Sequence, residues 1–368
     1  MEATNKRLAS IDLLRGLTVM LMIFVNNGAG DSIFPTLRHS QWNGLTLADC
    51  VFPSFLFIMG MSTYLSLRKF QFRWSKAVAW KVIRRAVILF LLGLAINYLD
   101  MALGGHPLDF GHLRVWGVMQ RLGICYLLCA VLALTCRRGF IPIIILGLAA
   151  YAALLLCCGG YDYDSTTNIL AKVDNGLVGW NHLYHKSPVD PEGLVSTFSA
   201  TLHTMIGFVV MEHLAKAKTL RGKTMFLDIV GVVMLAAGII LSVWLPLNKR
   251  VWSPSYVLVT TSIVCVVLGV LVDVVDKPTA EKRPWLQKRL GDSTLLKAFG
   301  MNPLVLYVGS EALAIIVGKA GIKDWAYDGI HAVISNAAWA GFVYALLFTA
   351  VFAVVGVWMY RRKVFVKI

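Results

Sequence analysis

Long apolar segments recur along the whole chain and constrain its fold more than any other feature. A helix needs roughly 20 mainly apolar residues to cross the hydrocarbon core of a bilayer, and about ten segments meet that requirement. The sequence predicts membrane spans at 11–27, 46–67, 82–99, 115–135, 140–157, 195–214, 226–245, 255–273, 298–317 and 337–359. Only 15% of the residues are charged, whereas a soluble domain carries about 25%. We therefore expect an all-α, polytopic transmembrane helix bundle that forms one domain over residues 1–368.

Basic residues indicate which connections between spans face the cytoplasm. Most of the 35 Lys and Arg residues fall in alternate connections, which the positive-inside rule assigns to the cytoplasmic side. Both termini are then expected to be cytoplasmic, with His39 on the outer side. The basic residues behind the net charge of +15 are thus explained by their role in setting the topology, so we expect no nucleic-acid partner. If the chain is bacterial, its expected location is the plasma (inner) membrane.

Two connections are longer than the rest. We expect an ordered outer loop at 158–194, because this polar segment is rich in aromatic residues. The segment 274–297 is expected to be a cytoplasmic loop, with a short amphipathic stretch from Trp285 to Leu290 at the membrane interface.

Several common catalytic motifs are missing from the sequence. It contains no Walker-type phosphate loop, no HExxH, no GxSxG and no His/Cys cluster with metal-ligand spacing. These absences argue against an ATPase, a zinc protease and a serine hydrolase, and we expect no bound metal. The seven cysteines lie mostly in apolar segments, where small buried side chains are the simpler interpretation.

A histidine lies in the short connection between the first two spans. His39 is followed by Trp42 and Asn43, and histidine is the side chain that accepts and returns protons near neutral pH. The pattern therefore indicates a catalytic base. An interfacial histidine in an aromatic belt remains the alternative.

Two further residues flank this histidine, and each has two interpretations. Asn26 ends the first span, where its amide could stabilise an oxyanion or, with Asn27, cap the helix. Asp49 lies a few residues into the second span. It could orient His39, pair with Arg15 or Arg121, or serve only as a first-turn acid favoured by the helix dipole.

Other polar residues occur within or beside the later spans. An intramembrane arginine such as Arg121 faces either a cavity or an ion-pair partner, and a proline such as Pro303 frees backbone groups within a span. We expect a substrate to contact Trp42, Asn43, Gln120, Arg121, Asn248, Lys249, Trp252 and Asn302. Asp190 and Glu192, before the sixth span, could attract an amine or cap the helix. On these residues alone, a transporter and an enzyme both remain open.

Seven sequence blocks, in order, resemble the heparan-alpha-glucosaminide N-acetyltransferase family. They are RLASIDLLRGLTVMLMIFVNN, HSQWNGLTLADCVFPSFLFIMG, RRAVILFLLGL, VWGVMQRLGICYL, DPEGLVSTFSA, PLNKRVWSPSYVL and FGMNPLVLYVGSE. The resemblance implies a membrane acetyltransferase that moves the acetyl group of cytosolic acetyl-CoA to the amine of a glucosamine on the other side. It also places the family's active-site histidine at His39 and its active-site asparagine at Asn26.

The resemblance leads to several further expectations. Anionic acetyl-CoA would be drawn by charge to Arg15, Arg84, Arg85 or Lys297. The chain begins a few residues before its first span, so we expect a short form without the amino-terminal extramembrane domain of the animal enzymes. The connection from Asn26 to His39 also differs from the family pattern, which leaves the acceptor open among amino sugars and other saccharides. Membrane lipid is an expected partner, and a homodimer is left open.

The mechanism that we expect has three residues in named roles. His39 removes a proton from the attacking amine, Asn26 stabilises the tetrahedral oxyanion, and Asp49 holds the histidine tautomer. Direct transfer and an acetyl-histidine intermediate both fit. The competing hypotheses are a transporter of a sugar or lipid-linked saccharide and a non-catalytic membrane scaffold.

Overall fold

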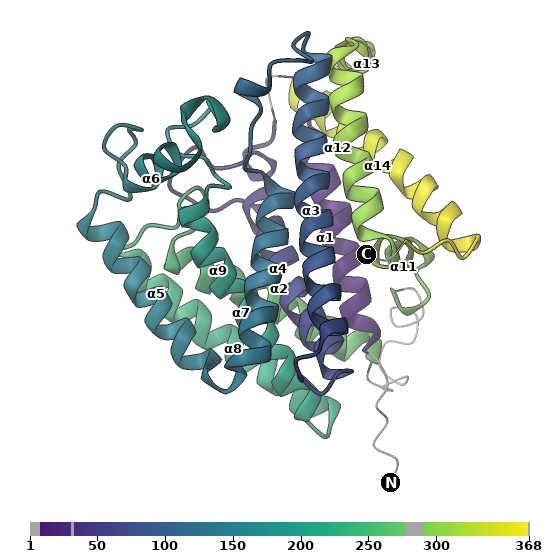
Figure 1. The fold of residues 1–368 in the computed structure, drawn as a ribbon. Coiled ribbons are helices and arrows are strands. Elements are labelled where there is room, and N and C mark those ends of the chain that lie inside the picture. Colours follow the sequence, from purple (N-terminus) through teal and green to yellow (C-terminus); the bar gives the residue numbers. More distant parts are fainter. Residues whose placement is uncertain (1–7, 31–32, 277–289, 367–368) are drawn as a thin grey trace.

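The computed structural model describes residues 8–30, 33–276 and 290–366, and within these ranges the long elements are helices (Figure 1). The helices are α1 (Ala9–Asn26), α2 (Leu47–Arg68), α3 (Lys76–Leu103), α4 (Val118–Thr135), α5 (Phe140–Cys157), α6 (Ile169–Val178), α7 (Leu194–Lys216), α8 (Leu220–Ser242), α9 (Pro254–Leu271), α11 (Thr294–Met301), α12 (Pro303–Lys319), α13 (Ile322–Val333) and α14 (Ala337–Arg361). Within the described residues, nine helices are long and apolar enough to cross a membrane, or ten if α11 and α12 count as one broken span. The all-helical membrane fold expected from the apolar segments is confirmed.

The centre of the bundle is formed by α2 and α7, which are the most buried of the candidate spans. Glycines allow these helices to pack closely, because a Cβ at Gly60 would collide with the backbone of Thr204, and one at Gly207 with the backbone of Phe57. α1 and α11 approach in the same way through Gly16 and Gly300. Small residues at helix contacts are typical of membrane bundles, where backbones must come close to gain van der Waals contact.

The span expected at 298–317 is divided into two helices. α11 ends at Met301 and α12 begins at Pro303, and their axes differ by 85°. Proline has no N–H to donate and is favoured at the first position of a helix, so the chain restarts there rather than continuing α11. The divided pair places α12 beside α3 and brings α11 close to the end of α14 (Figure 1).

The segment 158–194, which we expect on the outer side, contains α6 and a 3-10 turn at Trp180–His182. A small apolar cluster that includes Tyr151, Leu170, Val189 and Val251 joins this segment to the ends of α5 and α8. In Figure 1, α6 lies above α9 and α5. Of the amphipathic stretch expected at Trp285–Leu290, all but Leu290 lies outside the described residues.

Candidate functional site

The first turn of α2 brings His39 and Asp49 together. Asp49 Oδ2 accepts hydrogen bonds from the backbone N–H groups of Ser40 (3.1 Å) and Thr46 (3.2 Å). The Thr46 hydroxyl in turn accepts from the Asp49 N–H, which completes a capping box. Asp49 Oδ1 lies 2.9 Å from Nδ1 of His39. The carboxylate therefore caps the helix and contacts the histidine at the same time.

The contact with Asp49 favours one tautomer of His39. A carboxylate can only accept a hydrogen bond, so this 2.9 Å contact is satisfied when Nδ1 carries the proton and Nε2 keeps its lone pair. The Asp49 side chain is fully buried, whereas 42% of the His39 side chain is exposed. The imidazole is thus held from its buried edge and remains accessible from the surface.

Lys249 is the second polar neighbour of His39. Its Nζ lies 3.2 Å from His39 Nδ1 and 3.6 Å from Asp49 Oδ1. Burial lowers the pKa of His39, and the Lys249 charge lowers this pKa further, which outweighs the opposing effect of Asp49. His39 is therefore neutral near pH 7, as a general base must be.

Lys249 is carried by a tight turn between α8 and α9. The buried Asn248 organises this turn, because its Oδ1 accepts hydrogen bonds from the N–H groups of Arg250 (2.8 Å) and Val251 (3.1 Å). Its Nδ2 donates to Oδ1 of Asn43 at 3.1 Å. The turn is thereby attached to the His39 loop, although Asn43 and Asn248 are 205 residues apart.

Next to this turn, the buried side chains of Trp252 and Arg121 contact each other. Trp252 is fully buried and has a positive φ of 51°, which is unusual for a bulky residue. The Arg121 guanidinium lies 5.0 Å from its ring centroid. Arg121 is also buried, and its Nε donates to Thr197 Oγ1 at 3.1 Å. Gln120, its neighbour on α4, packs instead against Gly93 of α3.

The two adjacent asparagines at the end of α1 have different environments. The Asn27 side chain is buried and its Nδ2 donates to the carbonyl of Ile23 at 2.7 Å. Asn27 is therefore the asparagine that caps the C-terminal end of α1. Asn26 is exposed, and its Nδ2 donates to Oε1 of Glu311 on α12 at 3.3 Å. Sequence reasoning missed Glu311 as a site residue, although a carboxylate within a predicted span was the available signal.

Sequence reasoning also missed Arg114, which holds the 158–194 loop in place. Its Nη2 donates to Asp190 Oδ1 and to Glu192 Oε2, both at 2.8 Å, and its guanidinium lies 4.6 Å from the ring of Tyr184. Burial raises the pKa of Glu192, but the nearby cations, Arg114 foremost, outweigh this effect and lower it. The available signal was an arginine in a connection that we expect on the outer side, where the positive-inside rule predicts few basic residues.

Trp42 joins the His39 loop to the segment 158–194. Its Nε1 donates to the carbonyl of Tyr161 at 3.1 Å, and its ring lies 5.1 Å from that of Tyr163. Four of the residues expected to bind substrate thus lie in or against the His39 loop: Trp42, Asn43, Asn248 and Lys249. Two more, Trp252 and Arg121, are buried next to the turn that carries Lys249. Asn302 lies elsewhere, at the bend between α11 and α12.

A pocket of about 580 Å³ lies at the opposite end of α1 from Asn26. Its walls include Asp12, Lys297, Tyr360, Arg361, Lys363 and Phe365. Of the residues expected to bind a cofactor, Lys297 lines this pocket, and Arg15 contacts Asp12 of its wall at 3.0 Å. Arg84 is exposed on α3, and Arg85 lies 4.5 Å from the ring of Tyr126.

The comparisons with known proteins agree with one another. Residues 7–168 match the family model described as heparan-alpha-glucosaminide N-acetyltransferase, catalytic. The chain is 29% identical to heparan-alpha-glucosaminide N-acetyltransferase of Homo sapiens, in an alignment that covers 100% of this chain and 61% of the human protein. For the Mus musculus protein the identity is 30%, over 85% of this chain and 54% of the mouse protein. The chain therefore spans little more than half the length of these relatives.

Proposed function

Because the chain belongs to the heparan-alpha-glucosaminide N-acetyltransferase catalytic family, we propose that it transfers acetyl groups from acetyl-CoA to the amine of a glucosamine-type saccharide. The observation that carries the proposal is the contact between His39 and Asp49, which leaves an accessible base nitrogen inside the matched region. We further propose that the whole chain acts as one membrane domain. Acetyl-CoA would then arrive at the cytoplasmic face and the saccharide at the outer face.

The proposed reaction needs a neutral base and an uncharged amine. Nε2 of His39 accepts a proton from the amine as the amine nitrogen attacks the acetyl carbonyl carbon. A C–N bond forms, the C–S bond breaks, and CoA leaves as a thiolate that takes the proton back from His39. Asp49 keeps Nδ1 protonated throughout, and Lys249 opposes unproductive protonation of the ring.

Asn26 is the proposed donor to the oxyanion of the tetrahedral intermediate. An amide that is already oriented can stabilise developing charge without reorganisation. Its contact with Glu311 supports this role, because that hydrogen bond fixes one amide N–H and so the direction of the other. In a two-step route His39 would itself attack first, and ping-pong kinetics would distinguish this route from direct transfer.

One observation favours a transporter as the second candidate. Broken helices with polar residues at the break are a common feature of transporter binding sites, and α11 and α12 form such a pair with the buried Asn302 between them. The transporter hypothesis requires saccharide flux that does not depend on acetyl-CoA.

Reconstituted vesicles distinguish the two functions. Protein would be placed in liposomes with labelled acetyl-CoA inside and glucosamine outside, and both N-acetylglucosamine and free CoA would be measured. The acetyltransferase predicts labelled product outside and an equal amount of CoA inside. Movement of unmodified saccharide across vesicles that lack acetyl-CoA would instead favour the transporter.

A further inference from the structure

We propose that Arg121 is a positioning residue for His39, and that it acts through Trp252 and the turn that carries Lys249. The inference rests on the proposed acetyl transfer, in which His39 is the base. The Arg121 side chain is fully buried, so its influence on the site passes through the groups that it contacts. Three consecutive contacts, first to Trp252, then to the backbone of Lys249 and then to His39, connect it to the imidazole.

Arg121 is a buried cation whose hydrogen-bond partners are uncharged. Its Nε donates to Thr197 Oγ1 at 3.1 Å, and its Nη2 donates to the carbonyl of Gly193 at 3.2 Å and to Ser196 Oγ. Nη1 has no hydrogen-bond partner among the residues that the structure describes. A buried charge is costly unless other groups compensate it. The Trp252 ring supplies part of this compensation, because cation–π attraction is stronger away from water.

Trp252 has a backbone conformation that needs support from its neighbours. Its φ of 51° lies in the left-handed region, which a bulky residue rarely adopts. Its ring contacts Phe52 of α2 (centroids 5.4 Å apart) and Tyr256 of α9 (5.2 Å), and its carbonyl accepts a hydrogen bond from Ser199 of α7 at 2.8 Å. Arg121 of α4 contacts the same ring. Residues from four helices therefore hold Trp252 in this conformation.

The backbone of Trp252 closes the turn that carries Lys249. Its N–H donates to the Lys249 carbonyl at 3.2 Å, and the N–H of Ser253 donates to the Asn248 carbonyl at 3.0 Å. The direction of the Lys249 side chain therefore depends on where Trp252 lies. In this arrangement the ammonium is 3.2 Å from His39 Nδ1.

The position of Lys249 matters because three charged groups act on the imidazole of His39. Lys249 lowers the pKa of His39, as burial of the ring does more strongly, whereas Asp49 and Glu192 raise it. Coulomb interactions weaken with distance. A turn that moved away from His39 would therefore leave the effect of the two carboxylates less opposed, and the pKa of His39 would rise.

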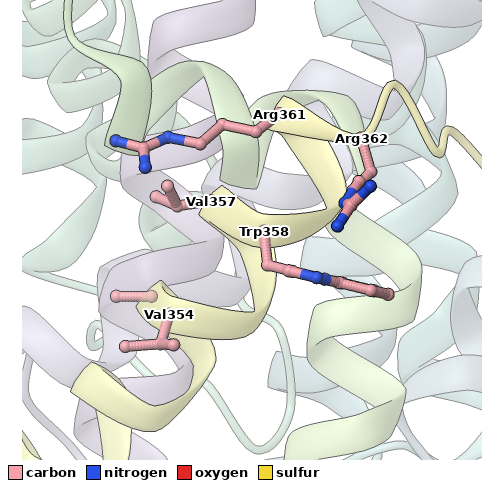
Figure 2. Close-up of a pocket in the computed structure, with 6 residues that line it drawn as sticks. Val354, Val357, Trp358, Arg361 and Arg362 are labelled. Atoms are coloured by element: carbon pink, nitrogen blue, oxygen red, sulfur yellow. The ribbon is translucent and has the colours of Figure 1, made fainter.

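An arginine near a tryptophan on α14 provides a matched control. Figure 2 shows Arg362 on the same side of the helix as Trp358, and both residues line a hollow of about 460 Å³. Trp358 is 58% exposed, whereas Trp252 is fully buried. Arg362→Gln therefore removes an arginine near a tryptophan without disturbing the core around the Lys249 turn.

The test measures the pKa of His39 directly, by NMR of the histidine rings in the full-length protein in neutral detergent. The His39 signal is assigned by its loss in His39→Ala. We expect Arg121→Gln to raise this pKa by about one unit, and Arg362→Gln to leave it unchanged. Trp252→Phe keeps a ring in the core but offers the guanidinium a weaker partner, so it should raise the pKa by a smaller amount. In a Lys249→Met background Arg121→Gln should add no further rise, because both changes act through the same ammonium.

Several results would overturn the positioning role. One is an unchanged His39 pKa in folded Arg121→Gln, even if its unfolding temperature falls, because a purely structural role lowers stability without moving this pKa. Another is a further rise on adding Arg121→Gln to Lys249→Met, which would show that Arg121 acts by another path. If Arg121→Gln does not fold, an unchanged pKa in Trp252→Phe decides against the inference in the same way.

The titration needs no turnover, which separates this inference from the proposed function. The expected changes in the His39 pKa, found with a wild type that transfers no acetyl group, would support the positioning role and contradict the function. Acetyl transfer by the wild type, found with a His39 pKa that is the same in all variants, would overturn the positioning role and leave the function standing.

Discussion

Nζ of Lys249 lies 3.2 Å from Nδ1 of His39, although the two residues are 210 positions apart in the chain. An ammonium at this distance disfavours a second positive charge on the imidazole. With the burial of the ring, it lowers the pKa of His39 below its usual value of 6.5. The turn that holds Lys249 therefore helps to keep the proposed base unprotonated.

Replacement of Lys249 by methionine is expected to raise the pKa of His39. Activity requires neutral His39, so kcat/KM falls as the pH drops through this pKa. Since the wild-type pKa lies below 6.5, the acid limb of the pH profile should move to higher pH in Lys249→Met. Lys249→Arg keeps the positive charge and should keep the limb near its wild-type position. An acid limb that is the same in all three proteins would contradict this role.

Asp49 has two roles that separate variants should resolve. Asp49→Asn replaces a carboxylate, which only accepts hydrogen bonds, by an amide whose NH2 group must face either His39 Nδ1 or the backbone N–H groups of Ser40 and Thr46. The variant therefore no longer holds the tautomer of His39. We expect kcat to fall about 10²–10⁴-fold. Thr46→Ala removes the helix cap and the hydroxyl's hydrogen bond to Asp49 Oδ2, but leaves the contact between Asp49 Oδ1 and His39. It should cost about 1 kcal/mol in the free energy of unfolding, with kcat much less affected than in Asp49→Asn. Equal kcat in both variants would exclude a catalytic part for Asp49.

The adjacent asparagines offer a matched pair for the oxyanion role. Asn26→Ala removes the exposed amide and is expected to lower kcat about 10²–10³-fold while the unfolding temperature stays nearly constant. Asn27→Ala removes the buried hydrogen bond to Ile23, and should cost about 1 kcal/mol of stability with little loss of kcat. The reverse pattern would move the proposed donor from Asn26 to Asn27. Both quantities can be measured on the same detergent preparations.

Arg114 is expected to stabilise the 158–194 loop in a pH-dependent way. Arg114→Gln leaves the carboxylates of Asp190 and Glu192 without their cation, which we expect to cost about 3 kcal/mol in the free energy of unfolding near pH 7. The folded-state pKa of Glu192 is lowered from 4.5, so its contribution is present above pH 4.5 and is lost as the pH falls through the lowered value. The difference in unfolding temperature between wild type and Arg114→Gln should therefore narrow below pH 4.5. A constant difference across that range would contradict the assignment.

The sequence predicted most of the spans because apolar length is a local property. It also predicted the nearness of His39 and Asp49, since ten residues and a helix start separate them. It did not predict that Asp49 would cap α2 and contact His39 together. One carboxylate has enough acceptor sites to cap a helix and contact a histidine at once, so the two roles are compatible.

Contacts between distant parts of the chain were harder to foresee. Lys249 was expected to bind substrate, and its place beside His39 depends on the hydrogen bond between Asn43 and Asn248. Glu311 meets Asn26 only because α12 packs against α1. Pro303 indicated that backbone groups within the ninth predicted span would be freed. The 85° angle between α11 and α12 could not be predicted, because it depends on the packing of α11 against α1 and α14.

Acetyl transfer by the wild type, His39→Ala and His112→Ala tests the central claim most directly. His112 is a suitable control, because its Nδ1 lies 2.8 Å from Asp109 in an exposed pair that resembles the His39–Asp49 contact but lacks its buried carboxylate. Labelled acetyl-CoA and glucosamine would be supplied to each purified protein in detergent, and labelled N-acetylglucosamine would be counted. We predict product from the wild type and His112→Ala, and a loss of at least about 10²-fold in His39→Ala with CoA binding retained. Near-normal turnover in His39→Ala would contradict the account.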